Sequence, residues 1–98
     1  MKKIFTLLAL TISFSMNAQL TAVTEGSNTG QRLSTSNASN HGNIGHKAVD
    51  LSYSDSSSTT KGATGYASTA MGQSTTASGS YSTAMGLSTN ASGTGSTA

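Results

Sequence analysis

The hydrophobic positions of this chain fall into three stretches with different patterns. Residues 4–14 form a nearly continuous apolar run behind Lys2 and Lys3. Between Val49 and Tyr53, apolar and polar residues alternate, and this period of two predicts a half-buried strand. In the last third of the chain the pattern recurs every fourteen residues. The chain therefore divides into a leader-like start, a stretch with little order in its pattern, and a repeat region.

The N-terminal pattern predicts a signal peptide over residues 1–18. A basic start, an apolar run and the small residue Ala18 before the cleavage point are typical of such segments. The run is shorter than the roughly 20 residues that a membrane-spanning helix needs, and a buried N-terminal helix is the alternative. The chain has no cysteine, so neither a lipid anchor on cysteine nor a disulfide is expected. We expect an exported protein with no membrane span in its mature chain.

The repeat region reads ATGYASTAMGQSTT over residues 63–76, ASGSYSTAMGLSTN over 77–90 and ASGTGSTA over 91–98. A fixed short period indicates stacked coils that bury their apolar faces against one another. Fourteen residues hold two short strands and two turns but no helix, which predicts an all-β parallel solenoid. The expected structural positions recur in columns, and they are Gly65, Ala70, Met71, Gly72, Ala77, Gly79, Ala84, Met85, Gly86, Ala91 and Gly93.

The region before the clear repeats is harder to interpret. Residues 19–40 are rich in Ser, Thr, Asn and Gly without a sustained period, which predicts a flexible lead-in with a short strand near Leu20–Val23. Residues 41–62 predict one strand and a degenerate first coil. Counting back fourteen residues from Ala63 places Val49 in the same column.

Charge and composition limit the function classes. The formal charge is +2, but without Lys2 and Lys3 the remaining basic and acidic residues balance. A neutral mature chain has no basic field for nucleic acid and no basic helix to lie on a membrane. The composition alone resembles a disordered Ser/Thr linker, whereas the strict register favours a fold. Because one coil carries so little apolar surface, we expect order to require stacking and oligomerisation.

The blocks S-x-A-x-G-x-x-S-x-A-x-G resemble the head repeats of trimeric autotransporter adhesins, the YadA-like head. The matching residues are Ser68, Ala70, Gly72, Thr75, Ala77 and Gly79, followed by Ser82, Ala84, Gly86, Thr89, Ala91 and Gly93. The resemblance implies a left-handed parallel β-roll, a homotrimer, and a place at the cell surface, in the outer membrane or outside the cell. It implies non-catalytic, multivalent attachment to a surface or host matrix.

The repeats differ from the family strand SVAIG, because this chain reads STAMG. Thr69 and Thr83 replace an apolar residue, and Met71 and Met85 take the isoleucine place. Alternation puts Thr83 and Met85 on one strand face, and the resemblance turns that face inward. Neck, stalk and barrel segments do not follow Ala98, so we expect the sequence to be part of a longer adhesin.

Candidate chemistry is sparse. His41, His46 and Asp50 lack a further well-spaced ligand, so no metal site is expected. Residues 42–45 are glycine-rich but lack the Lys-Ser/Thr of a phosphate loop. The serines have no positioned base. We therefore predict neither an enzyme nor a cofactor.

Three polar or aromatic features leave alternatives open. Tyr66 and Tyr81 either contact a ligand or simply cover coil edges. The triplets that begin at Asn37 and Asn90 match the glycosylation pattern, as chance also produces in such a composition. The column formed by Thr69, Thr83 and Thr97 resembles an ice-binding array. Besides adhesion, the alternatives are therefore a spacer or shaft of a tail-fibre-like surface protein and an ice-binding solenoid.

Overall fold

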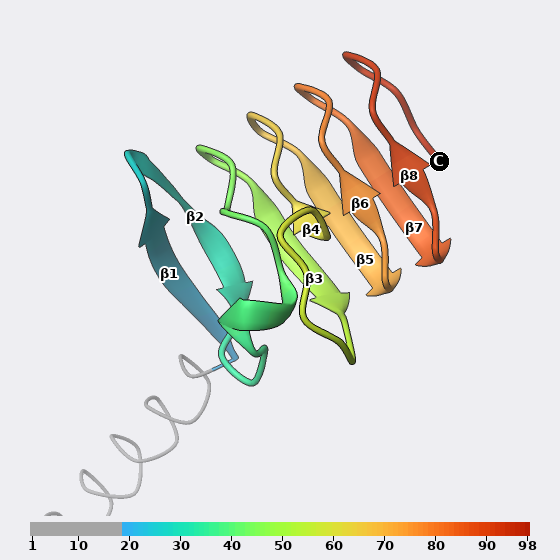
Figure 1. Cartoon of the computed structure of the whole chain (residues 1–98). Helices are drawn as coiled ribbons and strands as arrows, with labels where there is room; N and C mark the ends of the chain where they lie inside the picture. The colour runs from blue at the N-terminus through green and yellow to red at the C-terminus, as the bar shows by residue number, and fades with distance from the viewer. Residues whose placement is uncertain (1–18) are drawn as a thin grey trace, which may run out of the picture.

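A computed structural model describes residues 19–98, and the predicted signal peptide lies outside them. The described chain is built from β-strands and one short 3₁₀ turn, Ala38–Asn40, with no α-helix. One sheet has five strands in the order β1-β2-β3-β5-β7, and a smaller sheet has three in the order β4-β6-β8. Figure 1 shows the chain alternating between these two layers as it advances along the stack. The all-β prediction is confirmed.

The strands of the larger sheet are β1 (Leu20–Glu25), β2 (Asn28–Leu33), β3 (Val49–Tyr53), β5 (Thr69–Gln73) and β7 (Thr83–Leu87). Those of the smaller sheet are β4 (Gly62–Ala63), β6 (Thr76–Ala77) and β8 (Asn90–Ala91). All pairings among β2 to β8 are parallel. The described stack is elongated, with extents of 56 × 24 × 23 Å.

The fourteen-residue period appears directly as strand register. Thr69 pairs with Thr83, and Ala77 pairs with Ala91. The predicted register of the first coil is wrong, because Val49 pairs with Thr69 and does not share the column of Ala63. The loop of residues 54–61 joins β3 to β4, whereas only residues 74–75 join β5 to β6. Six extra loop residues thus lengthen the first coil to twenty and hide it from a fixed period.

Residues 19–40 are not the flexible lead-in that their composition predicts. Within this stretch, β1 and β2 form an antiparallel hairpin that includes the short strand expected near Leu20–Val23, and the 3₁₀ turn follows. β2 then runs parallel to β3, with Gln31 opposite Val49. Val23 packs against the buried core. The hairpin extends the larger sheet by two strands and covers one end of the stack (Figure 1).

The interior of the stack is made of small side chains. Ala70, Ala77 and Ala84 are fully buried, and Ser68 and Ser82 are nearly so. The expectation that the Thr–Met face points inward is therefore wrong for the single chain, because Met85 is 48% exposed. In the coils after the first, the two sheets lie so close together that small side chains, those of alanine, serine and threonine, fill the space between them. Long side chains must point outward.

Glycine positions explain this close approach. A Cβ on Gly65 or Gly79 would collide with the backbone carbonyl of the equivalent glycine in the next coil. Gly72 meets the same obstacle at Gly86, and its φ of +100° is a backbone conformation that side chains resist. These glycines let successive coils stack at strand spacing through the turns.

Candidate interaction surfaces

The outer face of the five-stranded sheet carries an apolar stripe. Leu51 pairs with Met71, and Met71 pairs with Met85, so their side chains follow one another across three coils. Leu51 and Met71 are half-buried, whereas Met85 and the nearby Leu87 are exposed, Leu87 by 70%. Because neighbouring strands lie about 4.8 Å apart, these side chains form one continuous surface. We call Leu51, Met71, Met85 and Leu87 the outer stripe.

A threonine ladder runs beside this outer stripe. Thr69 pairs with Thr83, and Thr83 forms a bridge with Thr97. Thr69 and Thr83 are half-buried and Thr97 is exposed, so the ladder faces outward with the methionines. The face is therefore amphipathic, with a hydroxyl column beside a thioether column.

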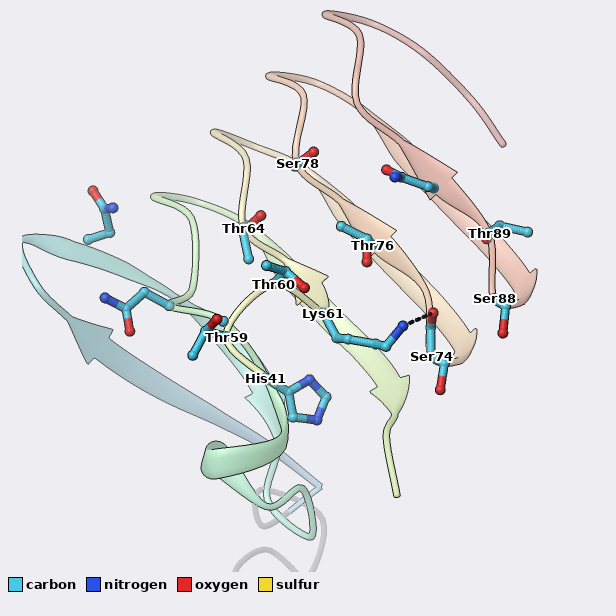
Figure 2. A pocket seen from close by; sticks show the side chains of 14 residues that line it. His41, Thr59, Thr60, Lys61, Thr64, Ser74, Thr76, Ser78, Ser88 and Thr89 are labelled. Carbon is cyan, nitrogen blue, oxygen red and sulfur yellow. Dashed lines mark hydrogen bonds between the residues drawn. The ribbon is translucent and has the colours of Figure 1, made fainter. Parts of the chain in front are cut away.

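A polar groove of about 990 Å³ lies over the smaller sheet. Its lining includes Thr64, Thr76, Ser78 and Asn90, with Lys61 among them. Figure 2 shows Lys61 extended across this face toward Ser74, with the hydroxyl side chains of neighbouring coils around it. The Lys61 ammonium donates a hydrogen bond to the Ser74 carbonyl at 3.4 Å. The groove thus presents hydroxyl and amide groups together with one cation.

Aromatic side chains meet at one turn edge of the stack. Tyr66 and Tyr81 contact edge to face with ring centroids 5.4 Å apart, and His46 lies 6.0 Å from Tyr66. The two tyrosines are 40% and 62% exposed. They cover the edge of neighbouring coils, as the structural interpretation expects, and both rings also remain accessible.

The triplets that match the glycosylation pattern lie in different surroundings. The Asn37 Oδ1 accepts hydrogen bonds from the Ser39 backbone N–H and hydroxyl in an exposed turn. Asn90 lies instead in β8, followed by the buried Ala91. Glycosylation at either residue stays a prediction.

A buried charged cluster joins the hairpin to the first coil. Arg32 in β2 donates to both carboxylate oxygens of Glu25, at 2.8 and 3.2 Å, and to the Gly42 carbonyl at 3.2 Å. Its Nε also lies 3.9 Å from the Asp50 carboxylate, which lies 3.0 Å from the His41 Nδ1. Arg32 is 3% exposed and Asp50 is fully buried. We call Arg32, Glu25, Asp50 and His41 the buried charge cluster.

The two carboxyl groups of this cluster titrate below their ordinary range. The hydrogen bonds from Arg32 hold the pKa of Glu25 below its usual value of 4.5, against the opposing effect of burial. Burial works against ionisation of Asp50 most strongly, but hydrogen bonds from His41 and Ser52 outweigh it and lower its pKa below 3.8. Both groups are therefore carboxylates at neutral pH.

The residues first considered for metal binding separate in the fold. His41 contacts Asp50, whereas the His46 Nδ1 accepts a hydrogen bond from the Thr29 N–H at 3.5 Å. Among residues 19–98, no group of three His, Asp, Glu or Cys side chains is placed to hold a metal ion. Within the glycine-rich segment, the N–H groups of Gly42 and Gly45 donate to carbonyls of the next coil, so they are not free to bind phosphate.

The buried charge cluster and the polar groove escaped the sequence analysis. The members of the charge cluster lie in different strands and loops that no motif links, and the groove adds loop residues to polar positions that recur every fourteen residues, such as Thr76 and Asn90. Hairpin residues such as Glu25 and Arg32 had only one available signal, which was charge placed in an otherwise uncharged stretch.

The repeats match a known family of protein repeats. The family model described as the YadA head domain repeat matches in two copies, over residues 63–89 and 77–98. No characterised protein and no solved structure gives a significant match. No helix among residues 19–98 is long and apolar enough to cross a membrane. Residues 63–98 of this chain therefore match the YadA head domain repeat.

Proposed function

We propose that this chain is the head module of a cell-surface adhesin, and that it works as a homotrimer of left-handed parallel β-rolls without catalysis. The observation that carries the proposal is the coincidence of YadA-like head repeats with an unpartnered apolar stripe on the same coils. Met71 and Met85 occupy the same position in successive coils, and Met85 and Leu87 are exposed on that face. An apolar stripe of this kind is a surface that favours association.

The trimer packs through the outer stripe. In this arrangement the methionine column fills the space between three rolls, and the threonines beside it hydrogen-bond across the interface. Self-association supplies the apolar burial that the thin interior cannot, because the buried apolar residues of the described chain are alanines and one isoleucine, Ile44. The adhesive surface is then the outward side of each roll, repeated three times.

Self-association is tested by sedimentation equilibrium on the mature chain with Met85→Asp. We expect the unaltered chain to give the mass of a trimer, and the variant to give a monomer, because a carboxylate in an apolar interface is strongly unfavourable. The matched control is Asn90→Asp, which adds the same charge on the smaller sheet. A monomeric unaltered chain, or equal effects of the two substitutions, would overturn the proposed interface.

Attachment is tested by binding of the trimer and of Met85→Asp to immobilised matrix proteins and to host cells. Three linked copies raise apparent affinity by about 10²–10⁴, so the monomeric variant should lose most of its binding. Failure of the intact trimer to bind any such surface would favour the spacer or shaft function over adhesion. Ice binding by the threonine ladder is tested separately by measuring thermal hysteresis of the monomeric variant, in which the ladder is exposed. Thermal hysteresis would support ice binding.

A further inference from the structure

We propose that the polar groove over the smaller sheet binds an acidic polysaccharide, a sugar chain that carries carboxylates, with Lys61 as the charged contact. The inference rests on the proposed adhesive function and names the ligand class for it. The groove lies on β4, β6 and β8, in the other sheet from the outer stripe. It therefore stays open when chains associate through that stripe.

The chemistry of the lining matches a sugar chain. Thr64, Thr76 and Ser78 offer hydroxyls that both donate and accept hydrogen bonds, and Asn90 adds an amide that does the same. Sugar hydroxyls require partners of this mixed kind. Apart from the buried His41, no aromatic side chain lines the groove, and no Leu, Ile, Val or Met does, so an apolar peptide would find no anchor there.

The charge of the lining selects an anionic sugar. Lys61 carries three N–H donors, and the one hydrogen bond found for them, to Ser74, is long at 3.4 Å. No carboxylate lines the groove. Glu25 and Asp50 are already held by Arg32 and His41 in the buried charge cluster. The Lys61 ammonium is thus available to a carboxylate on a ligand.

The groove is shaped for a linear polymer. Its lining comes from successive coils, with Thr76 opposite Gly62 on one side and Asn90 on the other. Polar groups therefore recur along the stack at about 4.8 Å, the strand spacing. The volume of about 990 Å³ lies at the upper end of ordinary ligand sites. A single cation without stacking aromatics makes the groove a poor site for nucleic acid.

The test measures binding of alginate oligosaccharides to the mature chain by calorimetry. Dextran serves as the uncharged sugar and polyglutamate as the charged chain without sugar. We expect alginate to bind, dextran to bind more weakly and polyglutamate not to bind. Lys61→Gln should weaken alginate binding by about tenfold or more, as loss of a charge-assisted contact does. Thr76→Val should weaken it several-fold.

Lys47→Gln is the matched control, because Lys47 is exposed and lies outside the groove. Equal weakening by Lys47→Gln, equal binding of polyglutamate, or no alginate binding at millimolar concentration would each overturn the proposal. Circular dichroism and sedimentation on every variant confirm that fold and assembly persist. If the trimer still attaches to matrix or cells while alginate does not bind, only the groove proposal fails and the proposed function stands.

Discussion

The buried charge cluster should control the stability of the N-terminal end of the stack. Replacing Arg32 with Met keeps an unbranched side chain of similar length but leaves the carboxylates of Glu25 and Asp50 without their shared cation. Arg32 is 3% exposed and donates three hydrogen bonds of 2.8 to 3.2 Å. Removing one partner of such a buried set costs about 3–5 kcal/mol. That is a large share of the total stability of a small domain.

The pH dependence gives this prediction a second signature. The pKa values of Glu25 and Asp50 are lowered in the folded chain, so their stabilisation is present above their unfolded values and is lost as pH falls through the folded ones. In Arg32→Met, Glu25 can relieve its unpaired charge by taking up a proton. The difference in unfolding free energy between the two chains should therefore shrink as pH drops toward about 3.

Equilibrium denaturation with urea at pH 7 and at about pH 3 measures both effects. Lys47→Met is the control, because it removes an exposed cation and should change stability by less than about 0.5 kcal/mol. A loss below about 1 kcal/mol for Arg32→Met at neutral pH would refute the reasoning. A loss that stays constant between the two pH values would refute the assigned role of the carboxylates.

Three further predictions concern the repeat geometry, each measured by thermal and urea unfolding. Gly72→Ala should destabilise the chain by more than Gly86→Ala, because both have positive φ but only Gly72 lacks room for a Cβ; equal losses would contradict the stacking argument. Ala67→Gly should stabilise the chain by roughly 0.5–1 kcal/mol, because Ala67 has a φ of 51° and glycine removes that strain. The gain is partly offset by the greater entropy of glycine in the unfolded chain, and a loss of stability would be the contrary result. Ala77→Leu should destabilise by about 1–3 kcal/mol through overpacking of the fully buried site, and a neutral outcome would indicate an interior wider than described.

Much of the repeat architecture could be predicted from local pattern. Gly65 and Gly79 recur at fourteen residues because each of these coils needs a residue without a Cβ at the same turn, where the next coil lies closest. Gly72 recurs at Gly86 because the backbone there adopts positive φ. Such constraints act within one coil and its neighbour, so they leave a periodic trace in the sequence.

Alternation along a strand separated Thr83 and Met85 from Ser82 and Ala84, but it carries no information about which set is buried. That choice follows from the distance between the two sheets, which admits alanine and serine and excludes methionine. Likewise, the polar residues Asp50 and Ser52 of β3 point inward while Leu51 points outward. Asp50 is accommodated there because it pairs with Arg32 and His41 inside the roll.

The period, the strand-rich fold and the positions of the small residues can be inferred from local pattern, since each depends on backbone geometry that repeats from coil to coil. The hairpin that covers the first coil, the longer loop of residues 54–61, the buried charge cluster and the groove become visible only in the folded chain. Glu25, Arg32 and Asp50 meet only because β2 runs parallel to β3 and brings separate segments side by side. No local rule links such residues, because their interaction energy exists only once the strands have paired.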